Sequence, residues 1–318
     1  MSIVSLLRAE TYDAAPLAAS LEQLLAPLGG MGAIVKPGDR VLLKPNLLTG
    51  SRPGHECITR PELVAAVAQQ VIAAGGKPFM GDSPAFGSAK GVARTNGYLP
   101  MLQDLNIPVV EFHGHRYAID AENFDHLRLS KEAMDADVVI NLPKVKAHCQ
   151  LTMTLGVKNL FGCVPGKMKA WWHLEAGKDQ DRFGEMLVQT ANAIAPNLTI
   201  LDGIIAHQGN GPSGGEARPL GILAASPDVF ALDCAILDLL NVDPHTVPTY
   251  NAAARLGLNP ETLEFPLLTP EELAIADWKL PDTLVPIDFG APRILKSTFK
   301  HLYIRWIKEP MQTYSNTK

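Results

Sequence analysis

The chain has 318 residues, and its 33 acidic and 28 basic side chains give a formal net charge of −5. With 47% hydrophobic and 19% charged residues, its composition is that of a soluble globular protein. The acidic balance argues against general nucleic-acid binding, which needs a basic face. No apolar run approaches the ~18 residues of a membrane span, and no secretory signal pattern opens the chain. We therefore expect a cytoplasmic protein.

β-rich runs alternate with helical patterns along most of the chain. We expect strands at 40–45, 77–81, 107–112, 136–141, 198–202 and 220–225. We expect helices from Pro61 to Gly75, over 183–194 and from Pro227 to Leu240, with further cover from 252–256. This alternation predicts an α/β fold, with a mostly parallel sheet and helices on both of its faces.

The predicted domain organisation is simple. We expect one α/β domain over residues 1–290, with its core at 35–245, followed by a basic amphipathic tail at 291–318. A tail of this kind can lie on a membrane, but it more often packs on its own domain or on a partner. We therefore expect neither membrane contact nor nucleic-acid binding.

Polar or glycine-containing segments follow four of the predicted strands. They are Lys44-Pro-Asn46, Gly81-Asp-Ser-Pro84, Asn141-Leu-Pro-Lys-Val-Lys146 and Asp202-Gly203. In an open α/β sheet, ligands bind in a crevice at the carboxyl ends of the strands. The sequence therefore predicts a ligand crevice at this edge of the sheet.

The segment from 138 to 174 contains five lysines, two histidines and no carboxylate. A cationic stretch in an acidic protein can attract an anionic ligand to one place. We single out Lys144, Lys146 and Lys158, because a buried lysine beside another cation has a lowered pKa. Such a lysine can hold a carboxylate or phosphate, or act as a general base or Schiff-base amine. Solvated loop lysines, or salt bridges to a surface helix, are the alternatives.

Three sequence motifs resemble known nucleotide or nucleophile motifs but depart from them. Gly209-Asn-Gly-Pro-Ser-Gly214 matches G-x-G-x-x-G without the helix that dinucleotide binding needs, so we expect a glycine loop closing over a ligand. Gly162-Cys-Val-Pro-Gly-Lys167 is one residue short of a P-loop. Ser83 precedes Pro84, which lacks the N–H of an oxyanion hole, so we expect Ser83 to position a ligand with Asp82.

The four cysteines are scattered and form no Cys-x-x-Cys pair. Reduced, buried thiols are one interpretation. The other is a metal or iron–sulfur cluster held by Cys57, Cys149 and Cys163, with a nearby histidine.

Five ordered segments carry a resemblance to a known family. They are Leu43-Lys-Pro-Asn-Leu47, Gly81-Asp-Ser-Pro84, Asn141-Leu-Pro-Lys-Val-Lys-Ala-His148, Gly156-Val-Lys-Asn-Leu-Phe-Gly-Cys163 and Asp202-Gly203. Over roughly residues 35–245 the chain resembles the domain-of-unknown-function 362 family. The resemblance implies an α/β fold and a redox-related setting, since many members carry an appended ferredoxin-type domain with two iron–sulfur clusters. This chain lacks that cysteine pattern, so an electron-transfer role would need a separate ferredoxin-like partner.

The leading hypothesis is a cytoplasmic enzyme, of unassigned reaction, that binds a small anionic substrate or cofactor. The expected catalytic residues are Lys144, Lys146, His148 and Asp82. The expected ligand-binding residues are Lys44, Asn46, Ser83, Lys158, Asn159, Asp202, Gly209, Gly211 and Glu216. Replacing Lys144 by alanine should then abolish ligand binding and leave the melting temperature nearly unchanged. The alternatives are an iron–sulfur carrier or accessory factor, and a non-catalytic scaffold that docks a redox partner.

Overall fold

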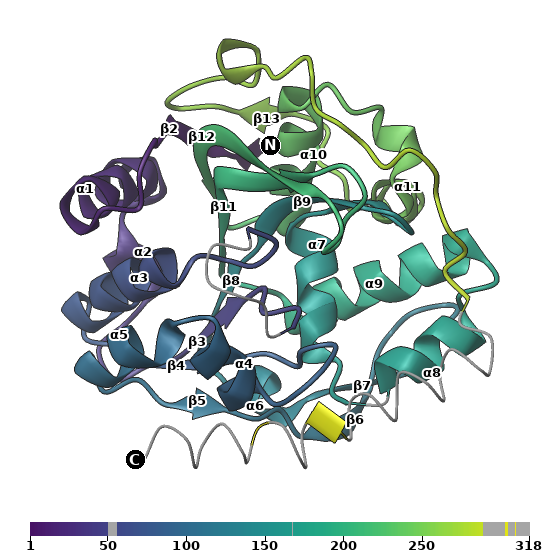
Figure 1. Cartoon of the computed structure of the whole chain (residues 1–318), viewed down its shortest axis with the longest axis horizontal. Coiled ribbons are helices and arrows are strands. Elements are labelled where there is room, and N and C mark those ends of the chain that lie inside the picture. Colours follow the sequence, from purple (N-terminus) through teal and green to yellow (C-terminus); the bar gives the residue numbers. More distant parts are fainter. Residues whose placement is uncertain (50–55, 167, 289–302, 305–308, 310–318) are drawn as a thin grey trace.

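A nine-stranded sheet organises the chain (Figure 1). The computed structural model describes residues 1–49, 56–166, 168–288, 303, 304 and 309. The strands of the sheet are β2 (Ser5–Arg8), β3 (Arg40–Pro45), β4 (Lys77–Gly81), β5 (Val109–Val110), β8 (Val138–Leu142), β9 (Lys144–His148), β10 (Thr152–Thr154), β11 (Leu198–Gln208) and β12 (Glu216–Ser226).

The centre of the sheet is parallel, in the order β11-β8-β3-β4-β5. Strand β9 continues the line of β8 after Pro143 and also runs parallel to β11. Antiparallel pairs complete the sheet, with β10 on β9, β12 on β11 and β2 on β12. Two small pairs lie apart from it: β1 (Ser2–Ile3) with β13 (Leu263–Glu264), and β6 (Gly114–Ala118) with β7 (His126–Ser130).

Helices cover both faces of the sheet, as the sequence predicted. They are α1 (Ala14–Leu25), α2 (Met31–Ile34), α3 (Pro61–Ala73), α4 (Ala89–Thr95), α5 (Tyr98–Asp104), α6 (Lys131–Met134), α7 (Gly156–Asn159), α8 (Met168–Glu175), α9 (Gln180–Ile194), α10 (Val229–Leu239) and α11 (Pro248–Arg255).

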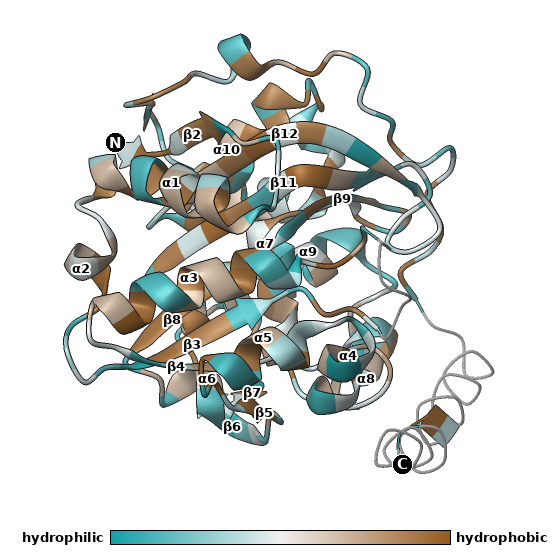
Figure 2. Cartoon of the chain, turned by 60° about the vertical axis from the view of Figure 1, so that its left-hand side comes forward, coloured by the Kyte–Doolittle hydropathy of each residue, from teal (hydrophilic) through white to brown (hydrophobic). Residues whose placement is uncertain are grey.

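Alternate residues along each central strand face opposite layers. Leu43 packs in the core with α1 and α3, whereas its neighbour Leu42 packs with α9. Strands buried on both faces read as continuous apolar runs, and β3, β4 and β8 are largely brown in Figure 2. The predicted fold class, an α/β protein with a mostly parallel sheet covered on both faces, is confirmed.

Local sequence signals explain several boundaries. Pro61 opens α3, and Gly75 with φ +87° follows its end, because glycine adopts left-handed backbone without a side-chain clash. The predicted strands at 40–45 and 77–81 coincide with β3 and β4.

Three predicted strands need correction. The expected strand at 107–112 forms only the two residues of β5. Strand β11 does not end at Asp202; it continues to Gln208, because residues 204–206 are apolar and stay in the sheet after an irregularity between Gly203 and Ile205. The strand expected at 220–225 begins earlier, at Glu216, and is antiparallel to its neighbour.

The predicted tail, 291–318, lies outside the described residues except for Tyr303, Ile304 and Glu309. The Glu309 carboxylate accepts hydrogen bonds from Ser88 N at 2.8 Å and Ser88 Oγ at 2.7 Å. Within the described ranges, no helix is long and apolar enough to cross a membrane. At the other end, β2 joins the sheet although it precedes the predicted core at 35–245.

Candidate functional site

Side chains from β3, β9 and β11, and from the segments that follow β3 and β4, meet beside the carboxyl ends of the central parallel strands. Lys44 contacts Asp82, Lys144 contacts Asp202, and Lys146 contacts Asn46. The four polar segments that follow the predicted strands are therefore brought together. They form two neighbouring groups with different charge balance.

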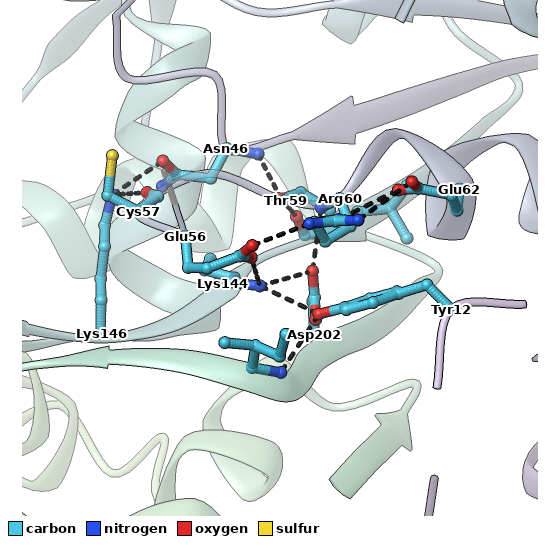
Figure 3. Close-up of polar contacts among 12 residues, drawn as sticks. Tyr12, Asn46, Glu56, Cys57, Thr59, Arg60, Glu62, Lys144, Lys146 and Asp202 are labelled. Carbon is cyan, nitrogen blue, oxygen red and sulfur yellow. Dashed lines mark hydrogen bonds and ion pairs between the residues drawn. The ribbon is translucent and has the colours of Figure 1, made fainter. Parts of the chain in front are cut away.

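The first group, the Asp202 network, consists of Tyr12, Glu56, Arg60, Lys144 and Asp202 (Figure 3). Lys144 Nζ lies 3.0 Å from Asp202 Oδ2 and 3.6 Å from Glu56 Oε2. Tyr12 Oη donates to Asp202 Oδ1 at 2.6 Å, and the Arg60 backbone N–H donates to Oδ2 at 2.9 Å. Every charged group in this network has a charged or hydrogen-bonding partner.

The charges of the Asp202 network nearly cancel. Arg60 also pairs with Glu56 at 2.7 Å, and its guanidinium carbon lies 4.7 Å from the centroid of the Tyr12 ring. Burial and the neighbouring Asp202 raise the pKa of Tyr12 far above its usual value, so its hydroxyl stays protonated. Lys144, fully buried and committed to Asp202, fits a structural role better than the binding of an anion.

The second group, the lysine cluster, consists of Lys44, Lys146, Lys158 and Lys169. Its nearest carboxylate is Asp82, which lies 2.9 Å from Lys44 Nζ and accepts from the Leu47 backbone N–H at 3.0 Å. Lys44 and Lys146 are buried, whereas Lys158 and Lys169 are partly exposed. Among the described residues, four ammonium groups therefore share one carboxylate, which Lys44 already engages.

A relay of amide side chains holds the buried end of the lysine cluster. Lys146 Nζ donates to Asn46 Oδ1 and to the Cys57 carbonyl, both at 2.9 Å. Asn46 Nδ2 donates to Asn159 Oδ1 at 2.9 Å, and Asn159 Nδ2 donates to Asn141 Oδ1 at 2.8 Å. The amides present neutral oxygens to Lys146, so they orient its ammonium without neutralising the charge.

Burial lowers the pKa of three lysines in the cluster. The pKa of Lys146 falls to about 8 and that of Lys169 to about 8. Burial, followed by the ammonium groups of Lys146 and Lys169, lowers the pKa of Lys158 to about 7. Cations held close together without enough anions favour their neutral forms.

His148 ends β9 beside the lysine cluster. Burial lowers its pKa well below the usual range, and Lys158 and Lys146 lower it further, so the ring is neutral. Its Nδ1 accepts from the Gln150 backbone N–H at 3.1 Å, which places the ring proton on Nε2. A neutral imidazole with a fixed tautomer can donate a hydrogen bond from Nε2.

Hydrogen bonds of Ser83 connect the segment after α7 to the end of β4. Its backbone N–H donates to the Gly162 carbonyl at 3.0 Å, and its Oγ accepts from the Gly166 N–H at 3.1 Å. Its own carbonyl accepts from Lys169 Nζ. This docking brings Lys169 into the cluster.

Gly162 covers the Lys44–Asp82 ion pair at close range. A Cβ at this position would overlap Asp82 Oδ1 and Lys44 Nζ. The ion pair therefore requires glycine at position 162. In the segment that is one residue short of a P-loop, this glycine allows close packing.

Asp233 of α10 sets the position of the turn that carries Lys158. Its carboxylate accepts from the backbone N–H groups of Gly156 at 2.7 Å and Val157 at 3.1 Å, at the start of α7. Burial raises the pKa of Asp233 to about 7.

The glycine loop lies between β11 and β12 and does not bring Glu216 to the lysine cluster. Glu216 is exposed and pairs with Lys279 at 2.9 Å. Gly209 N donates to the Lys279 carbonyl at 2.8 Å, and the Gly211 carbonyl accepts from Cys149 N at 3.0 Å. The loop therefore packs against the end of β9, with Glu216 turned to solvent.

The expectation that Cys57, Cys149 and Cys163 gather around a metal is not confirmed. Across residues 1–49, 56–166 and 168–288 the structure groups no three His, Cys, Asp or Glu side chains as metal ligands. Burial raises the pKa of the Cys163 thiol to about 12 and also raises that of Cys57.

Sequence reasoning missed several members of these groups. They are Tyr12, Glu56, Arg60, Lys169 and Asp233. Lys169 belongs to the acid-free stretch and could have been chosen on that ground. Tyr12 has no local signal, since only the fold brings it to Asp202.

Comparison with known proteins shows which protein family the chain belongs to. The family model described as "Domain of unknown function (DUF362)" matches residues 41–238, and the chain belongs to this family. The chain is 72% identical over 314 residues to "Thylakoid-associated protein sll1697" of Synechocystis, with 98% of each protein covered. The lactate racemase apoprotein of Thermoanaerobacterium thermosaccharolyticum shows a weaker likeness of fold, with a TM-score of 0.47 and 13% identity. That likeness covers 72% of this chain and 55% of the racemase.

Proposed function

We propose that the protein is an enzyme that binds a small anionic substrate or cofactor at the lysine cluster, through Lys146, Lys158 and Lys169. The observation that carries this proposal is the charge imbalance of the cluster. The nearest carboxylate, Asp82, is engaged by Lys44, so three ammonium groups remain without a carboxylate among the described residues. Buried charges are normally paired, and a ligand with two or more negative charges would complete this site.

The arrangement also supports proton chemistry. Lysines with pKa values of about 7 and 8 exchange protons near neutral pH, and His148 offers a neutral Nε2–H. An anion bound beside them would favour their charged forms and raise those pKa values. Binding near pH 8 should therefore take up protons from the buffer.

Isothermal titration calorimetry of the full chain tests the proposal. Inorganic phosphate, pyrophosphate and succinate are titrated at pH 8 in two buffers of different ionisation enthalpy. We expect binding by at least one anion, with proton uptake, and a loss of binding in Lys158→Met. Lys90→Met, which removes an exposed lysine of α4, is the matched control and should bind normally. No binding of any anion at millimolar concentration would refute the anion site.

We also propose a location on the cytoplasmic face of a membrane. The thylakoid association named for the 72% identical relative and the mixed basic and apolar sequence of residues 293–308 support a peripheral attachment. Cell fractionation should find the chain on membranes and release it with high salt or alkaline carbonate. Recovery in the soluble fraction alone, or resistance to alkaline washing, would contradict this location.

A further inference from the structure

We propose that Lys158 is a nucleophilic amine that forms an imine with the carbonyl carbon of a small oxo acid, whose carboxylate is held by Lys169. The inference rests on the proposed anion site and assigns it a substrate class and a covalent step.

The hydrogen bonds of the lysine cluster single out Lys158. Lys44 donates to the Pro45 carbonyl, Lys146 to Asn46 and Cys57, and Lys169 to the Ser83 carbonyl. Among the described residues, Lys158 Nζ has no such acceptor. It lies 5.1 Å from the centroid of the Phe161 ring. No hydrogen bond to an acceptor among the described residues therefore has to be broken before this nitrogen attacks a carbonyl carbon.

The position of Lys158 suits a nucleophile. Lys158 is partly exposed, whereas Lys146 is buried. The turn that carries it is fixed by two backbone hydrogen bonds to Asp233, at 2.7 and 3.1 Å. An amine on a capped turn can be held in one orientation toward a bound carbonyl.

The environment also supplies reactive amine. With its pKa lowered to about 7, roughly half of the Lys158 side chains are neutral at pH 7. An ordinary lysine with a pKa of ~10.4 is neutral in about one molecule in 2,500 at that pH. The fraction of nucleophile therefore rises on the order of a thousandfold over a surface lysine.

The atoms of the step balance without an oxidant or reductant. The Lys158 nitrogen forms a bond to the carbonyl carbon, and the oxygen becomes a hydroxyl. That oxygen then leaves as water, and a carbon–nitrogen double bond forms. Both hydrogens of the water come from the Lys158 nitrogen.

Lys146 can move these protons. Its ammonium has three N–H groups, of which two are donated to Asn46 Oδ1 and the Cys57 carbonyl. The third can pass a proton to the oxygen and recover one from the nitrogen.

Reductive trapping tests the inference on the full chain. The protein is incubated with pyruvate or glyoxylate, reduced with sodium cyanoborohydride, and examined by intact mass and peptide mapping. We expect one carboxyalkyl adduct, on Lys158, formed at least about tenfold faster than on any other lysine. Inorganic phosphate should protect against it.

Two variants keep the test decisive. Lys158→Arg retains the positive charge but cannot form an imine, so it should bind phosphate and lose the adduct. Lys90→Arg should keep both properties, since it changes an exposed lysine of the same protein. Intact phosphate binding without a preferred adduct on Lys158 would overturn this inference and leave the anion site standing. If the wild type binds none of the tested anions and forms no preferred adduct on Lys158, both proposals are overturned.

Discussion

Replacing Lys144 by methionine should destabilise the protein and leave anion binding largely intact. Lys144 and Asp202 are both fully buried, and their charged atoms lie 3.0 Å apart. Removing one partner of a buried ion pair typically costs about 3–5 kcal/mol, because the other charge remains unpaired. Asp202 keeps the Tyr12 hydroxyl and the Arg60 N–H as donors, so we expect a loss at the lower end, about 3 kcal/mol.

Thermal unfolding measures this loss. In a domain of this size, each kcal/mol shifts the melting temperature by roughly 2 °C, so Lys144→Met should melt about 6 °C below the wild type. Adding Asp202→Asn removes the unpaired carboxylate, and the double variant should recover part of the lost stability. Urea unfolding of the same variants provides an independent measure.

Lys158→Met is the variant to compare with Lys144→Met, because each replaces one lysine of the two charged groups by methionine. It removes an ammonium that neighbouring cations repel, so its melting temperature should equal or exceed that of the wild type while anion binding is lost. If Lys144→Met instead melted like the wild type and failed to bind anions, Lys144 would belong to the binding site. The assignment of the two charged groups would then be refuted.

Three further predictions concern packing, pH and position. Gly162→Ala should lower both the melting temperature and the anion affinity, because the new Cβ overlaps Asp82 and Lys44; Gly32→Ala, with open space around it, should be neutral in both assays. The lysines with lowered pKa values bind more protons in the unfolded state than in the folded state between about pH 7 and 10. The stability of the anion-free protein should therefore increase as the pH rises through this range. The affinity for anions should decrease over the same range, because the lysines lose their charge. Comparing wild-type melting curves with those of a variant lacking all three lysines measures that slope, and equal slopes would contradict it. Asp233→Ala removes the side chain that caps α7, so it should lower the free energy of unfolding by roughly 1–2 kcal/mol and weaken anion binding. An unchanged anion affinity would show that Asp233 does not position the turn.

The sequence predicted the layers of the fold better than its strand boundaries. Pro61 and Gly75 mark the ends of α3, and the apolar run before Lys44 marks β3, because these signals are local. The continuation of β11 beyond Asp202 depends on pairing with β12, which no local pattern states. The sequence did not predict the antiparallel pairing of β12 with β11 and β2 for the same reason.

The sequence predicted the location of the candidate site better than the role of each residue in it. Strand-end polar segments indicated where lysines and carboxylates meet. Whether a given lysine finds a carboxylate depends on residues far away in sequence, such as Tyr12 and Glu56 for Lys144. Lys144 and Lys146 are two residues apart and point to the same face of β9, yet one is neutralised and the other is not.

The pairing of β2 with β12 has a consequence for how the protein can be divided. Arg8 to Ser5 pair with Ile222 to Ala225, and Tyr12 follows directly. A fragment cut to the family region, 41–238, would leave β12 as an open edge strand and Asp202 without its tyrosine. Open apolar edges recruit other chains and aggregate. Expression trials of smaller pieces should therefore keep the first twelve residues, since the smallest folding unit extends beyond the family boundaries.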